Sequence, residues 1–75
     1  MQRYRNRGGD SGVTAYEAEK TAIKVEFNNG RVYEYDYASA GPDNIETMKR
    51  LAASGKGLST FISQHVHDAY ARRLR

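Results

Sequence analysis

The stretch Ala22–Tyr37 reads AIKVEFNNGRVYEYDY, and it decides the fold of the chain. On both sides of its centre, polar residues alternate with β-branched or aromatic residues, which is the period-two pattern of a half-buried strand. The centre itself, Asn28–Gly30, has the composition of a tight turn. The stretch therefore predicts a β-hairpin whose second strand carries tyrosines at alternate positions.

The length of the turn decides which face of the sheet the tyrosines occupy, because a shift of one residue moves every side chain to the other face. A two-residue loop at 29–30 would turn Tyr33 and Tyr35 to the polar face, where they could stack on a ligand. A three-residue loop at 28–30, with its glycine in the left-handed conformation, places Val25 opposite Tyr33. We favour the three-residue loop because it gathers the apolar residues on one face. Both tyrosines are then mostly core, with their hydroxyls at its rim.

The rest of the pattern predicts one more strand and two helices. Alternation at 13–18 predicts a strand before the hairpin. After the hairpin, Asp43 and Glu46 form a capping-box-like start for a helix at 43–53. Apolar residues at helical spacing also predict a second helix at 58–72. Its apolar side is expected to cover the face of the hairpin that carries the tyrosines. The predicted fold is α+β: a three-stranded antiparallel sheet in the order β-β-β-α-α, with both helices packed on one face.

The composition describes one small domain with basic ends. A chain of 75 residues without cysteine has neither a disulfide nor a thiolate metal site, so homo-oligomerisation would be one way to enlarge its core. No apolar run approaches the roughly 20 residues of a membrane span, so we expect no membrane partner and a cytoplasmic location. Six arginines stand in the first seven and last four residues, whereas the remainder holds nine acidic residues against six basic ones.

The domain boundaries follow from the same distribution. Residues 1–12 combine alternating arginines with glycines and show no apolar pattern, which is typical of an unstructured tail. Residues 13–72 carry the predicted elements, and 73–75 form a basic C-terminal end. The arginine–glycine run at 7–9 has two interpretations, a solvated tail or an RNA-contacting segment. Deleting residues 1–9 is expected to leave stability almost unchanged.

Candidate catalytic groups are few. His65 and His67 stand two apart, so on a helix they would point away from each other and could not share a metal ion. The Gly55–Gly57 segment resembles a phosphate-binding loop, but the glycine and the hydroxyl residue that a P-loop requires are missing. As a helix N-terminus with Lys56 nearby it could still attract an anion, or it could be a plain interhelical turn. We therefore expect no enzyme, no metal and no cofactor.

Several parts of the chain together match one known pattern: Val13, Tyr16, Ile23-x-Val25-x-Phe27, Asn29-Gly30, Tyr33-x-Tyr35 and Ser54 to Val66. This pattern resembles that of the KTSC domain, which occurs at the C-terminus of some lysyl-tRNA synthetases and as small free-standing bacterial and phage-like proteins. The resemblance implies that residues 13–72 form a domain of this family, for which RNA binding has been suggested. Its motif residues would be Tyr33, Tyr35, Ser54 and Gly57. The serine–glycine loop is lengthened here, and Ser63 stands where the family tends to have asparagine.

We expect the protein to be a non-enzymatic module that binds RNA or another phosphate-bearing nucleotide ligand. Basic side chains would contact phosphates, and rim tyrosines could stack on bases. The expected phosphate-binding residues are Arg3, Arg5, Arg7, Lys56, Arg72 and Arg73. Acidic residues on the sheet face would repel a nucleic acid, so contact must use the ends of the chain or the Gly55–Gly57 segment. Two alternatives stay open: an oligomeric protein of phage type that sequesters a nucleotide signal, and a protein–protein adaptor.

Overall fold

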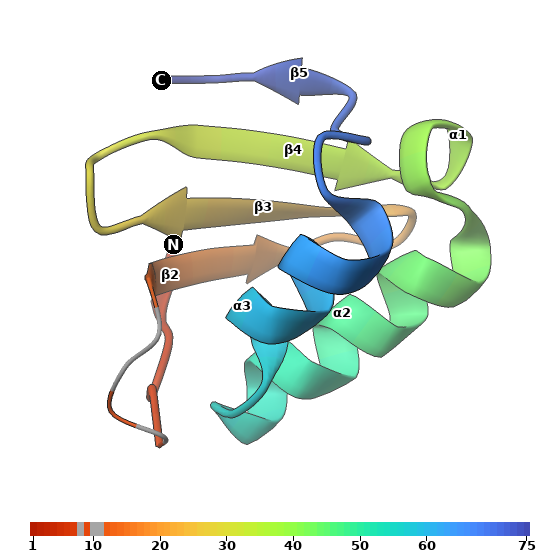
Figure 1. Ribbon diagram of the computed structural model, residues 1–75. Helices are drawn as coiled ribbons and strands as arrows, with labels where there is room; N and C mark the ends of the chain where they lie inside the picture. Colours follow the sequence, from red (N-terminus) through yellow and green to blue (C-terminus); the bar gives the residue numbers. More distant parts are fainter. Residues whose placement is uncertain (8, 10–11) are drawn as a thin grey trace.

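The computed structural model describes residues 1–7, 9 and 12–75, and its centre is an antiparallel sheet with helices on one face (Figure 1). Within these described residues, five strands follow one another in the sheet in the order β1-β2-β3-β4-β5. The strands are β1 (Gln2–Arg3), β2 (Val13–Ala18), β3 (Ala22–Phe27), β4 (Val32–Asp36) and β5 (Arg72–Arg73). The helices are α1 (Tyr37–Ala40), α2 (Pro42–Ser54), α3 (Leu58–Phe61) and the π-helical turn η1 (Ile62–Val66). Figure 1 shows α2 and α3 on the same side of the sheet.

The central hairpin has the predicted three-residue register. Ile23 pairs with Tyr35 and Val25 pairs with Tyr33, so both tyrosines share a face with the aliphatic residues of β3. Gly30 has a φ of +88°, the left-handed conformation that this loop requires. The two-residue alternative is therefore excluded, and the tyrosines face the helices.

The small α+β fold is confirmed, but the prediction of a three-stranded sheet is wrong. Each end of the chain adds one short strand: β1 pairs with β2 through Gln2 and Tyr16, and β5 pairs with β4 through Arg72 and Glu34. The outer strands of a three-stranded sheet leave rows of unpaired N–H and C=O groups, and any extended neighbouring segment can pair with them. A strand of two residues is too short to show the alternation of polar and apolar residues. The sequence pattern therefore contained no signal for β1 or β5.

The expectation of an unstructured tail at 1–12 is corrected for the residues that the structure describes. Besides the β1 pairing, the Tyr4 N–H donates to the Thr14 carbonyl (3.0 Å), and the Tyr4 side chain is only 3% exposed. The N-terminal segment is therefore part of the core. Likewise, the basic end at 73–75 is not a free end, because Arg73 belongs to β5. Gly8, Asp10 and Ser11 of the expected tail lie outside the described residues.

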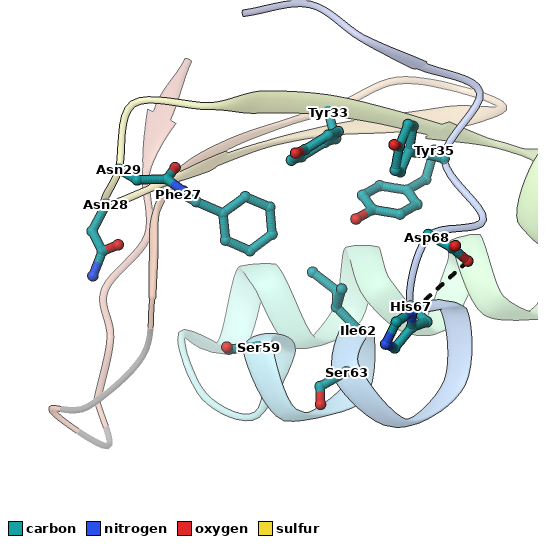
Figure 2. Close-up of a pocket in the computed structure, with 11 residues that line it drawn as sticks. Phe27, Asn28, Asn29, Tyr33, Tyr35, Ser59, Ile62, Ser63, His67 and Asp68 are labelled. Atoms are coloured by element: carbon teal, nitrogen blue, oxygen red, sulfur yellow. Dashed lines mark ion pairs between the residues drawn. The ribbon is translucent and has the colours of Figure 1, made fainter.

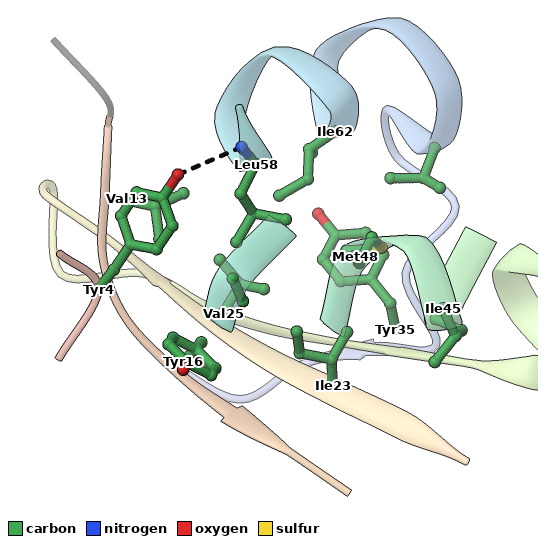
Figure 3. Close-up of a cluster of buried hydrophobic side chains, with 12 residues drawn as sticks. Tyr4, Val13, Tyr16, Ile23, Val25, Tyr35, Ile45, Met48, Leu58 and Ile62 are labelled. Carbon is green, nitrogen blue, oxygen red and sulfur yellow. Dashed lines mark hydrogen bonds between the residues drawn. The ribbon is translucent and has the colours of Figure 1, made fainter. Parts of the chain in front are cut away.

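The core lies between the sheet and the helices (Figure 3). The aliphatic face of α2 repeats as predicted, with Ile45, Met48 and Ala52 buried. The buried cluster consists of Tyr4, Val13, Tyr16, Ile23, Val25, Tyr35, Ile45, Met48, Ala52, Leu58, Ile62 and Val66. In Figure 3 the Tyr4 hydroxyl points at the Leu58 amide, which donates to it over 3.2 Å. This bond joins the N-terminal segment to the first turn of α3.

The helical half differs from expectation at both of its ends. An additional short helix, α1, follows β4 directly, because Asp36 and Ser39 form a capping box in which each side chain bonds the other's backbone N–H. Tyr37 therefore leaves the tyrosine face and donates its hydroxyl to Glu46 of α2 (2.6 Å). The predicted cap of α2 by Asp43 is absent, since its N-cap is Gly41 with Pro42 at the first turn.

The second predicted helix, expected at 58–72, ends much earlier. It becomes π-helical at Ile62–Val66 and stops at His67, whose φ of +45° cannot continue a right-handed helix. The chain then returns to the sheet edge to form β5. Every helix in the described part of the chain is too short or too polar to cross a lipid bilayer.

Candidate functional site

A pocket opens between the central hairpin and the last helical turns (Figure 2). Its volume is about 490 Å³, within the range of small-ligand pockets. Its lining residues are Phe27, Asn28, Asn29, Tyr33, Tyr35, Ser59, Ile62, Ser63, His67, Asp68 and Tyr70. We call it the aromatic pocket. The favoured hairpin register creates it, because that register turns the β4 tyrosines towards α3 and η1.

Four aromatic rings form one wall of the aromatic pocket. The ring centroids of Tyr33 and Tyr70 lie 4.5 Å apart at a tilt of 42°. Phe27 meets Tyr33 edge-on at 5.9 Å, and Tyr35 meets Tyr70 edge-on at 6.2 Å. Burial, followed by the nearby Tyr33, Tyr70 and Asp68, raises the pKa of Tyr35 from 10.0 to about 12. Tyr35 is therefore neutral at pH 7, and its ring presents an apolar face.

The opposite wall is polar and comes from the helical turns. Figure 2 shows Ser59 and Ser63 below the rings, with His67 and Asp68 at the end of η1. His67 Nδ1 lies 3.8 Å from the Asp68 carboxylate. His67 has a left-handed φ, and it directly follows a π-helical turn; both features concentrate at functional sites. On this side the lining therefore includes hydroxyls, an imidazole and a carboxylate beside the apolar Ile62.

The aromatic pocket brings serine, histidine and aspartate together without building a nucleophile. Within the described part of the chain, no hydrogen bond joins the hydroxyl of Ser59 or Ser63 to the imidazole of His67, as an activated serine would need. The other histidine, His65, stacks on Phe61 with ring centroids 4.6 Å apart. No group of three or more His, Asp or Glu side chains among the described residues is placed to hold a metal ion. The described side chains of the pocket offer a ligand aromatic rings and hydrogen-bonding groups.

The predicted phosphate-binding residues divide into two groups, and the first forms one exposed corner. The Arg7 N–H donates to the Gly55 carbonyl (2.7 Å), and Arg5 packs on the same glycine. These contacts bring Arg5 and Arg7 to the turn that carries Lys56. We call these three exposed cations the basic corner. None of them forms an ion pair within residues 1–7, 9 and 12–75.

The arginines of the C-terminal end are already engaged. Arg72 donates through Nε to Glu34, 2.7 Å away, and Arg75 pairs with Glu26. Both glutamates belong to the acidic face of the sheet, so this end neutralises that face instead of offering free charge. Arg73 shares a face with Tyr33 by strand register, and its Nε donates to the Arg75 carbonyl (3.3 Å). Arg3 lies in the edge strand β1 and is exposed.

The residues of the family motif occupy separate places. Tyr33 and Tyr35 line the aromatic pocket, whereas Ser54 and Gly57 do not. The Ser54 hydroxyl donates to the Leu51 carbonyl (2.9 Å) at the end of α2, and Gly57 has a left-handed φ of +86°. Because the Tyr4 hydroxyl already accepts the Leu58 N–H, one of the amides that an anion could use at this segment is occupied.

Sequence reasoning missed several residues of the aromatic pocket: Ser59, His67, Asp68 and Tyr70. They were assigned to a continuous helix at 58–72, and Tyr70 to its buried stripe. Nothing in the local pattern shows that the helix stops at Val66 or that the following residues turn back over the hairpin.

No protein-family model, curated protein or solved structure matches this chain. The aromatic pocket and the basic corner are therefore the features that bear on function.

Proposed function

We propose that the protein is a non-enzymatic module that binds single-stranded RNA, and that its basic corner contacts the phosphates. The observation that carries the proposal is the contact of Arg5 and Arg7 with Gly55, which gathers three exposed cations that form no ion pair with any described residue. Arginine and lysine together suit phosphate: the guanidinium bonds two oxygens at once, and the ammonium adds a compact charge.

The support comes from how these cations are held. The segment before them is anchored by the β1 pairing and by the buried Tyr4, so the backbone of Arg5 does not have to be ordered upon binding. A preorganised site loses less conformational entropy when it binds than a flexible tail does. The sequence pattern alone predicted a flexible tail at this place, whose arginines would have to be ordered upon binding.

The charges on the face of the sheet also favour the basic corner, and not that face, as the place where phosphates bind. Glu34 is nearly buried and pairs with Arg72, and Glu26 pairs with Arg75, so Arg72 and Arg75 are bound to acidic residues of the sheet. A phosphate would have to compete with these carboxylates. Of the six predicted phosphate-binding residues, the proposal keeps Arg5, Arg7 and Lys56 and assigns Arg72 a structural role.

A salt titration tests the proposal. RNA affinity is measured by fluorescence anisotropy, with an unstructured oligonucleotide, for the parent and for the triple variant Arg5→Gln, Arg7→Gln, Lys56→Gln. Three lost phosphate contacts should flatten the slope of log K against log salt by about 2, because each contributes ~0.7 for single strands. The affinity should fall at every salt concentration.

The matched control removes three other exposed cations, Lys20, Arg31 and Arg50, by the same substitution to glutamine. Both triple variants have the same net charge, so a general charge effect would weaken them equally. Equal slopes in the two variants would refute the basic corner as the phosphate site. Absence of RNA binding by the parent would refute the function itself.

The resemblance to the KTSC domain and a cytoplasmic location accord with this proposal, and both stay predictions. The oligomeric small-ligand alternative predicts that the purified protein self-associates in solution, whereas the adaptor alternative does not require self-association. Light scattering of the purified protein with and without RNA would show a self-associated species for the former.

A further inference from the structure

We propose that the aromatic pocket binds a single unstacked nucleobase with its ribose, as a site separate from the basic corner. The inference does not rest on the proposed function, because a nucleoside carries no phosphate. Its first support is size: about 490 Å³ suits one small ligand and is too little for a folded partner or a duplex.

The second support is the shape of the aromatic wall. Tyr70 is 37% exposed and stands in the segment between η1 and β5, so part of its ring faces solvent. The rings of Tyr33 and Tyr70 both line the pocket, and their faces are tilted by 42° to each other. Base–aromatic stacking uses such faces and tolerates any base, because every base has a π-face.

The third support is the set of hydrogen-bonding groups around the rings. In the described part of the chain, the side chains of Asn28, Ser59 and Ser63 make no hydrogen bond to the protein. A ligand whose edge carries both donors and acceptors would satisfy them, and the Asp68 carboxylate would accept from an exocyclic amine or a ribose hydroxyl. A purely apolar ligand could not replace water at the exposed side chains of Asn28 and Ser63.

Charge excludes the phosphate from the interior of the aromatic pocket. Among the described residues, no lysine or arginine lines it, whereas Asp68 and His67 do. An anionic group beside that carboxylate would be repelled. The part of the ligand that enters is therefore neutral, which a base with ribose is, and any phosphate would stay outside.

The experiment is a titration of ¹⁵N-labelled protein with adenosine, guanosine, cytidine and uridine, followed by NMR. At least one nucleoside should bind saturably with a Kd of about 1 mM, since one stacked ring with a few hydrogen bonds is a weak ligand. The shifts should concentrate at Tyr33, Ser63 and Tyr70. Absence of saturable shifts with all four would overturn the inference.

Two exposed positions of one helical turn provide a blocking variant and its control. Ser63→Phe places a ring in the aromatic pocket and should abolish binding, whereas Gln64→Phe adds the same ring outside the lining and should not. Tyr70→Ala removes a stacking face and should weaken binding by roughly 5- to 100-fold. Unchanged affinity in Ser63→Phe and Tyr70→Ala would place the nucleoside elsewhere and refute the site.

Two further arms separate the possible failures. The triple glutamine variant of the basic corner should bind nucleosides like the parent. Nucleoside binding is therefore expected even if the basic corner does not contact RNA phosphates. Phenol serves as an aromatic probe without a base edge. Equal affinity for phenol and for the nucleosides would show an unspecific aromatic cleft and would overturn the assignment to a nucleobase.

Discussion

Replacing Tyr4 by phenylalanine tests whether the N-terminal segment is a structural part of the domain. The substitution keeps the buried ring and removes only the hydroxyl that accepts the Leu58 N–H over 3.2 Å. The amide stays at the buried start of α3 and loses its acceptor. An unsatisfied buried donor costs about 1–3 kcal/mol, and the length of this bond favours the lower half of that range.

This loss is large for a chain of 75 residues, whose whole free energy of unfolding is roughly 4–11 kcal/mol at typical values per residue. At about 4–8 °C per kcal/mol for a domain of this size, Tm should fall by roughly 5–15 °C. The assay is thermal and urea unfolding followed by far-UV circular dichroism at pH 7.

Tyr16→Phe is the matched control, because Tyr16 is also nearly buried (6% exposed) and its hydroxyl bonds no group in the described part of the chain. It should melt close to the parent. If Tyr4→Phe and Tyr16→Phe melt alike, Tyr4 does not support α3 and the reasoning fails. By the same logic, deleting residues 1–7 should destabilise the fold, contrary to the expectation from the sequence, because it removes the Tyr4 ring from the core.

Two further predictions concern backbone contact and pH. Gly55→Ala should lower the free energy of unfolding more than Gly57→Ala: both have left-handed φ, but a Cβ at Gly55 would lie 2.6 Å from Arg5 Cβ, against 3.8 Å to the nearest atom at Gly57. Equal losses in urea unfolding would mean that the N-terminal segment does not pack there. Because burial raises the pKa of Tyr35 from 10.0 to about 12, its contribution to stability should be full below pH 10 and lost as pH rises towards 12. Tyr35→Phe should reduce that alkaline decline, and an unchanged decline would contradict the burial argument.

The candidate sites were predictable from sequence only in part. Arg5, Arg7 and Lys56 could be named as cations, but their proximity could not, because 49 positions separate Arg7 from Lys56. The tyrosines Tyr33 and Tyr35 could be placed on the helix-covered face. That this face is left partly open as a pocket depends on where the last helix stops, which is not a property of β4.

What the sequence by itself determined is the local structure of the centre. Strand alternation together with a glycine that can adopt the left-handed conformation favours one hairpin register, because the other would turn the β4 tyrosines away from the apolar residues of β3. The apolar spacing of α2 likewise specifies its buried side. These signals are local, because each involves neighbours within one element or across one turn.

Only the tertiary structure decided the rest. Whether the two ends pair with the sheet depends on unpaired backbone groups at its edges, which are the same for every sequence and leave no pattern in the side chains. The early stop of the last helix at His67 is also a tertiary result, because the pairing of β5 with β4 competes with helical propensity and prevails. The basic corner depends on the pairing of the N-terminal segment with the sheet, and the aromatic pocket depends on the early end of the last helix. Neither could therefore be located before the tertiary structure was known.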